Sequence, residues 1–100
     1  MKILDVIFVK IFVAESSHLA HDILHYLKNE AKIRGVSIFR AVSGFGDSGL
    51  HTSTLLDLSL NMPLTIEFFD LPEKIEETLL HLNTLVKSGH IVFWKAQVND

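Results

Sequence analysis

The residues best suited to hold an anion stand together near the middle of the chain, in the glycine-rich run Ser43–Gly49. Closely spaced glycines allow consecutive backbone N–H groups to turn toward one centre. Gly44, Phe45 and Gly46 are therefore candidate ligand-binding residues. The run lacks the phosphate-binding pattern G-x-x-x-x-G-K-[ST], so a tight turn that requires positive φ angles is the alternative interpretation.

Arg40 precedes this run and is a further candidate. A guanidinium group can grip a phosphate or a carboxylate through two parallel hydrogen bonds, which supports a role in anion binding. The alternative is a structural ion pair, for which Glu67 and Asp70 are the candidate partners.

Histidines form two separate groups that could bind a metal. His51 and Thr52 follow the glycine-rich run and are further candidate ligand-binding residues. The imidazole of His51 can bind a metal, hydrogen-bond a base or respond to pH; the alternative is a local hydrogen bond. His18, His21 and His25 have the spacing i, i+3 and i+7, which places them on one helix face. Because they lack an H-E-x-x-H pattern, a solvated helix surface is the favoured interpretation.

Composition argues against several classes of protein. The chain has no cysteine, which excludes disulfides and thiol nucleophiles, and no serine stands in a G-x-S-x-G pattern. Its 9 basic and 12 acidic residues give a net charge of −3, unlike proteins that bind nucleic-acid backbones. No apolar run approaches the ~20 residues of a membrane-spanning helix, and no signal peptide is recognisable. We expect a cytoplasmic protein that is neither an enzyme nor dependent on a cofactor, with no membrane insertion.

The elements that position these residues follow from apolar patterning. With 100 residues, 48% of them hydrophobic, the chain suffices for a single domain over residues 1–100. Runs of β-branched and aromatic side chains predict strands at residues 4–13, 36–42, 63–69 and 91–98. Helical spacing predicts helices at residues 17–34 and 70–87. A serine cap opens the first helix and Gly35 ends it, while Asp70 and Glu73 form a capping-box-like pair at the second.

The order βαββαβ predicts an α+β, ferredoxin-like sandwich: an antiparallel four-stranded sheet with two helices on one face. Right-handed crossovers place the first and third of these strands centrally. Phe39 and Phe69 would lie on the uncovered face, where self-association would bury them. The connection 43–62 exceeds the ~12–15 residues of an ordinary loop, so we expect it to carry function and to be partly mobile without a ligand.

The run Arg40-Ala-Val-Ser-Gly-Phe-Gly, followed by Leu50-His-Thr, resembles the domain of unknown function 190 (DUF190) family of PII-like proteins. Glu15-Ser16 after the first strand and Met62-Pro63-Leu64 before the third add to a resemblance that covers nearly the whole chain. It implies a PII-like homotrimer whose sheets line a shared centre and whose subunit clefts receive ligands. Relatives of PII commonly sense adenine nucleotides and regulate a partner protein.

The sequence departs from PII proteins before the last strand. In PII proteins a loop that contains glycine and lysine at this point helps to hold the nucleotide phosphates. The corresponding stretch here is only Lys87-Ser88-Gly89-His90, which puts that phosphate site in question. Lys87 is still a candidate ligand-binding residue that would reach the site from a neighbouring turn or subunit.

The sequence thus predicts a non-catalytic PII-like regulator that binds a small anion, such as an adenine nucleotide, and acts on a partner protein. The alternative is a divalent-metal-binding ferredoxin-like trimer, similar to cation tolerance proteins, which would use His51 or the histidines of the first helix. A small enzyme with an active site assembled across subunits is a third hypothesis.

Overall fold

The structure is a computed structural model that describes residues 1–46, 49–52 and 62–100; at 45, 46 and 49–52 it describes the backbone alone. In chain order its elements are β1 (Ile3–Ala14), α1 (His18–Asn29), β2 (Val36–Arg40), β3 (Ser43–Gly46), β4 (Gly49–Thr52), β5 (Pro63–Asp70), α2 (Pro72–Leu85) and β6 (Ile91–Asn99). No helix in these described residues is long and apolar enough to cross a membrane.

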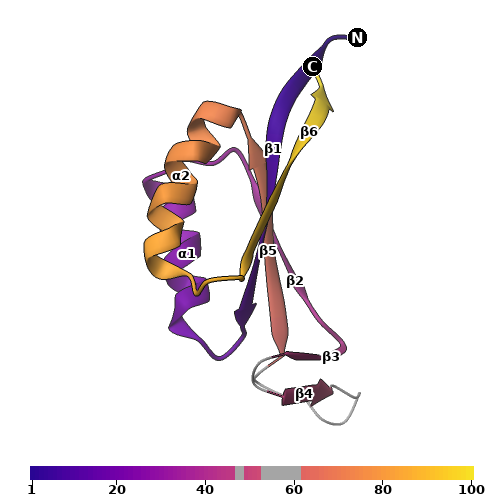
Figure 1. The fold of residues 1–100 in the computed structure, drawn as a ribbon, viewed down its shortest axis with the longest axis vertical. Helices are drawn as coiled ribbons and strands as arrows, with labels where there is room; N and C mark the ends of the chain where they lie inside the picture. Colours follow the sequence, from indigo (N-terminus) through magenta and orange to yellow (C-terminus); the bar gives the residue numbers. More distant parts are fainter. Residues whose placement is uncertain (47–48, 53–61) are drawn as a thin grey trace.

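The main sheet has the strand order β2-β5-β1-β6, with every neighbouring pair antiparallel. Both helices cover the same face of this sheet (Figure 1). The predicted ferredoxin-like fold is therefore confirmed, including the central position of the first and third predicted strands, which are β1 and β5. The two edge strands are β2 and β6.

The core lies between the sheet and the helices. Residues at every second position of β1 and β5 point to it, because successive side chains of a strand alternate between the two faces. It consists mainly of Val9, Ile11, Val13, Ala20, Ile23, Leu27, Leu64, Ile66, Phe68, Ile75 and Leu82. Burial of each large apolar side chain stabilises the fold by about 1.5–3 kcal/mol before entropy is counted, so this face drives folding.

Helix α1 begins as predicted, with the Ser17 hydroxyl accepting a hydrogen bond from the Leu19 N–H at 3.0 Å. It ends at Asn29, however, well before the predicted Arg34. The Ala31 N–H donates to the Tyr26 carbonyl at 2.9 Å, and Lys32 adopts a left-handed φ of 55°. The prediction that Gly35 ends the helix was wrong, because the chain reverses at Lys32 instead.

The capping box predicted for α2 was also wrong. The helix begins at Pro72 after Leu71, which makes no side-chain capping hydrogen bond. Asp70 is buried one residue earlier, where Oδ1 accepts from the Leu71 N–H at 2.8 Å and Oδ2 from the Arg34 N–H at 3.2 Å. The Lys74 ammonium lies 3.6 Å from Oδ2. Asp70 thus joins the end of β5 to the segment after α1 and to the first turn of α2.

The connection predicted as a loop at 43–62 contains an antiparallel hairpin of β3 and β4. The paired positions are Ser43 with Thr52, Gly44 with His51, Phe45 with Leu50 and Gly46 with Gly49. Sequence reasoning missed this hairpin because the segment lacks alternating apolar residues. The predictions for residues 53–61, including their mobility, lie outside the described residues.

The face of the main sheet opposite the helices, called the open face below, carries a row of aromatic rings. Phe8 lies directly between Phe69 and Trp94 on the neighbouring strands, with ring centroids 6.2 and 4.9 Å away. Phe39 is 57% exposed on the same face, as predicted, whereas Phe69 is half-buried. The Arg34 guanidinium covers the Phe69 ring at 5.3 Å from its centroid.

Candidate functional site

Four strand ends meet at one end of the main sheet, called the hairpin end below: the C-terminal ends of β1 and β2 and the N-terminal ends of β5 and β6. The hairpin of β3 and β4 lies beyond this end, while the chain termini lie at the other (Figure 1). Arg40 is the last residue of β2 here. The Ala41 N–H donates to the Pro63 carbonyl at 2.9 Å and extends the pairing of β2 with β5 by one residue.

Arg40 forms an ion pair with Glu15, which directly follows β1. The Arg40 Nε–H is shared between both carboxylate oxygens, at 3.0 Å from Oε1 and 2.9 Å from Oε2. The side chains are 36% and 30% exposed, so solvent reaches both partners. The guanidinium that sequence analysis assigned to an anion therefore already holds a carboxylate of its own chain.

Glu15 also holds the residue that precedes β5. Its Oε2 accepts a hydrogen bond from the Met62 N–H at 3.3 Å, and its own N–H donates to the Met62 carbonyl at 3.0 Å. Met62 is completely buried. Because Arg40 precedes the hairpin segment and Met62 follows it, Glu15 ties both roots of that segment to the end of β1.

The environment of Glu15 favours its ionised form. The hydrogen bond from Arg40 has the largest effect and lowers the pKa of Glu15. Desolvation, the second largest, raises it, while the Met62 N–H and the positive charge of Arg40 lower it further, so the net pKa is lowered. Glu15 is accordingly a carboxylate at neutral pH, and the pair carries two full charges.

The predicted alternative partners of Arg40, Glu67 and Asp70, were wrong. Arg40 pairs with Leu64, so it shares the helix-facing side of the sheet, whereas Glu67 is on the open face beside Lys10 at 3.9 Å. Asp70 lies at the other end of β5, next to Ile7 of β1. Glu15 was present in the family resemblance, but sequence analysis gave it no role in the site; a charge of opposite sign directly after the first strand was the available signal.

The hairpin brings several other candidates together through its backbone. Gly44 lies directly opposite His51, and Thr52 lies opposite Ser43, near the root beside Arg40. A Cβ atom added to Gly44 would stand 4.0 Å from the Pro63 side chain, so β3 packs closely along the start of β5. The backbone positions of Phe45 and Gly46 are farther from the root, toward the hairpin turn.

Lys87 lies at the hairpin end but at the other edge of the sheet. It is in the turn between α2 and β6, where its carbonyl accepts from the His90 N–H at 3.2 Å, and the His90 carbonyl accepts from the Phe12 N–H at 2.9 Å. Arg40 ends the opposite edge strand, three interstrand spacings or roughly 14 Å away. A single chain therefore does not place Lys87 beside Arg40.

The histidines of the alternative metal-binding hypothesis do not form a metal site in the described part of the chain. His18, His21 and His25 are exposed on α1. Among the described residues, no group of three or more His, Asp or Glu side chains could share a metal ion. The side chain of His51 lies outside the described residues.

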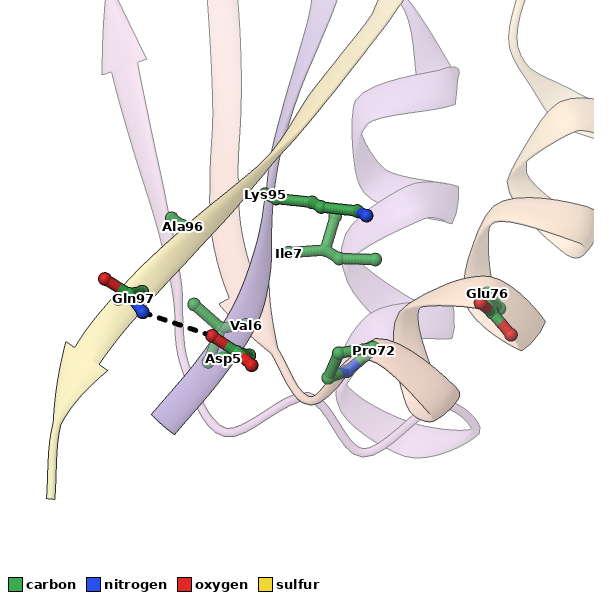
Figure 2. Close-up of a pocket in the computed structure, with 8 residues that line it drawn as sticks. All are labelled: Asp5, Val6, Ile7, Pro72, Glu76, Lys95, Ala96 and Gln97. Atoms are coloured by element: carbon green, nitrogen blue, oxygen red, sulfur yellow. Dashed lines mark hydrogen bonds between the residues drawn. The ribbon is translucent and has the colours of Figure 1, made fainter. Parts of the chain in front are cut away.

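A hollow of about 680 Å³ lies between α2 and the strands β1 and β6 (Figure 2). Lys95 points from β6 toward the helix side together with Ile7, and Gln97 Nε2 donates to Asp5 Oδ1 at 3.3 Å. Glu76 and Pro72 border it from α2. Among the residues whose side chains the structure describes, no candidate ligand-binding residue lines this hollow.

Comparison with known proteins agrees with the fold. The UPF0166 protein of Methanocaldococcus jannaschii is 26% identical over 89 residues, which cover 84% of this chain and 82% of that protein. CPII, a nitrogen regulatory PII-like protein from Thiomonas intermedia K12 bound to ADP, AMP and bicarbonate, superposes with a TM-score of 0.72 and 19% identity, covering 99% of this chain and 92% of CPII.

The divalent ion tolerance protein CutA1 from Ehrlichia chaffeensis has a TM-score of 0.60 and 8% identity, covering 95% of this chain and 82% of that one. At such identities these structures establish the fold alone. The model of the DUF190 family, described as "Uncharacterized ACR", matches residues 6–98. With nearly its whole length matched and a PII-like fold, the chain belongs to the DUF190 family.

Proposed function

We propose that this protein is a non-catalytic, PII-like regulatory protein that binds a small anion, in the simplest case an adenine nucleotide, at the hairpin end of the sheet. The observation that carries the proposal is the position of Arg40, a partly exposed guanidinium at the root of a glycine-containing hairpin. The ADP, AMP and bicarbonate bound to CPII support this choice of ligand, because all three carry negatively charged oxygens that a guanidinium binds.

We further propose a homotrimer that buries the open face. Trp94 and Phe39 leave aromatic surface exposed there, and association would remove it from water. Arg40 and Lys87 end opposite edges of the sheet, so a ring that sets β6 of one subunit beside β2 of the next brings two cations to one cleft. The ligand site is then shared between subunits.

Regulation of a partner protein would follow from a population shift. A ligand changes the affinity for a partner only if it binds one arrangement of the hairpin end more tightly than another. The hairpin projects from the sheet (Figure 1), so a partner protein could contact it and distinguish the two arrangements.

Isothermal titration calorimetry with ADP, AMP and bicarbonate tests the proposal. Replacement of Arg40 by alanine should weaken ADP binding by roughly 1.5–3 kcal/mol, the range for a hydrogen bond to a charged group. Lys28→Ala is the control, because Lys28 is an exposed cation in the last turn of α1, on the side of the sheet away from the open face. It should leave ADP affinity within about twofold of the wild type.

Two results would reject the nucleotide site: equal ADP affinity in the wild type and Arg40→Ala, or no heat with any of the three ligands. Chromatography of the ADP after titration should recover it unchanged, and formation of a product would instead identify an enzyme. Thermal stabilisation by divalent cations without any by nucleotides would favour the metal-binding hypothesis.

A further inference from the structure

We propose that Glu15 is an internal competitor for the anion that binds Arg40, and that its displacement couples anion binding to the backbone at the start of β5. This inference rests on the proposed function, since it concerns the same arginine. Glu15 would thus lower the affinity of Arg40 for the anion, and its movement on binding would change the hydrogen bonding of the Met62 N–H.

The competition follows from the geometry of the ion pair. Both carboxylate oxygens of Glu15 contact the Arg40 Nε–H, at 2.9 and 3.0 Å, as a carboxylate or phosphate ligand would. An incoming anion that takes this donor must replace Glu15, and if Glu15 stayed in place the two negative charges would repel each other. Binding of an anion through Nε therefore requires the Glu15 side chain to turn away.

The coupling follows from an oxygen that accepts two hydrogen bonds. Oε2 of Glu15 accepts from Arg40 Nε at 2.9 Å and from the Met62 N–H at 3.3 Å. A rotation that releases Arg40 removes this acceptor from Met62 as well. The hydrogen bond from the Glu15 N–H to the Met62 carbonyl belongs to the backbone, and it remains. The expected change is consequently local: the Met62 N–H loses its acceptor while the strands stay paired.

The cost of this displacement is modest because the pair is partly exposed. Exposed ion pairs are weak, so displacing one changes an equilibrium constant by a factor of only about 1.4 to 5. Glu15 therefore lowers the affinity for the ligand by a few-fold without blocking the site. A competitor of this strength can be displaced by a ligand that makes further contacts.

Glu15→Gln tests the competition, because glutamine keeps the length of the side chain but removes its charge. In calorimetric titrations ADP should bind this variant about two to five times more tightly than the wild type. Glu76→Gln is the matched control: it removes one charge from the exposed surface of α2 and should leave ADP affinity unchanged.

The coupling is measured on the wild type by amide hydrogen exchange at Met62, which does not depend on how well a variant folds. Saturation with ADP should speed exchange of the Met62 N–H at least severalfold. The Ala41 N–H, which donates to the Pro63 carbonyl, should exchange at an unchanged rate.

The outcomes separate this inference from the function on which it rests. If ADP binds through Arg40, but Glu15→Gln binds it no better and Met62 exchange does not respond, Glu15 is a structural partner only and the inference is overturned. If only Glu15→Gln binds ADP, the competitor role is supported and is stronger than expected. If neither protein binds ADP or inorganic phosphate, both proposals fail together.

Discussion

Trp94 of β6 stacks on Phe8 of β1, with ring centroids 4.9 Å apart and ring planes inclined by 22°. The contact arises because the two residues are direct partners in the antiparallel register, which places their side chains on the same face. Aromatic pairs of this kind add about 0.5–1.5 kcal/mol beyond the area that they bury. Since Phe69 extends the row on the other side of Phe8, an aromatic strip crosses three strands on the open face.

The resemblance to PII-like proteins predicts a particle of about three chains in light scattering, and burial of the open face would hold those chains together. Phe39→Asp should lower that mass at micromolar concentration, because a carboxylate would be buried without a partner. Leu80→Asp is the control, since Leu80 is 77% exposed on α2, which covers the opposite face of the sheet. A monomeric wild type, or equal loss of mass in both variants, would contradict assembly through the open face.

Two leucines of α2 allow a matched test of the core. Leu82 is fully buried, and its replacement by alanine should lower the free energy of unfolding by about 2–5 kcal/mol. Leu80 lies on the same helix but is 77% exposed. Leu80→Ala should therefore change the free energy of unfolding by no more than about 0.5 kcal/mol. Urea unfolding at neutral pH measures both. Similar effects of the two substitutions would show that α2 packs with another face.

The ion pair of Glu15 predicts a dependence of stability on pH. The folded state holds the pKa of Glu15 below its ordinary value of 4.5, so the unfolded protein binds the proton more tightly. The stabilisation by the pair is fully present above the unfolded value and is lost as pH falls through the lower folded value. Glu15→Gln should therefore be less stable than the wild type at neutral pH and approach it in acid. A difference independent of pH in urea unfolding would disprove this linkage.

The buried carboxylate of Asp70 predicts a loss of folding stability when it is removed. Asp70→Ala leaves the N–H groups of Arg34 and Leu71 without their carboxylate acceptor, and the free energy of unfolding should fall by about 1–3 kcal/mol. Asp22→Ala, on the exposed surface of α1, is the control and should be nearly neutral. Thermal unfolding of both variants checks the difference. Equal melting temperatures would mean that other groups replace the Asp70 contacts.

The fold could be predicted because the alternation of apolar and polar residues within each segment already shows which side chains face the core. Alternation of Leu64, Ile66 and Phe68 with Thr65 and Glu67 identifies a strand with one buried face, and the structure confirms it. The helix boundaries were less accessible. Nothing in the local pattern distinguishes Lys32, where the chain reverses, from a residue that continues the helix, because its left-handed conformation depends on contacts made elsewhere.

The sequence indicated which residue types could form the site, but it did not show which of these residues contact one another. Arg40 could be chosen for its chemistry, yet its partner Glu15 lies 25 positions away, directly after β1, and β1 is not a neighbour of β2 in the sheet. Only the order of the strands and the place where each one ends bring the two charges together. The hairpin of β3 and β4 likewise depends on pairing between segments whose glycines carry no apolar signal.

The central place of β1 sets the order in which the chain can complete its fold. As the protein is synthesised, β1 emerges first, but one of its edges stays open until β6, the last strand, has formed. Until then Phe8 has no Trp94 to stack against, and a row of unpaired backbone groups remains available to other chains. Because pairing of β1 with β6 closes the longest loop between paired strands, we expect it to be the slow, non-local step of folding. A chain interrupted before Ile91 would therefore aggregate through its most apolar strand.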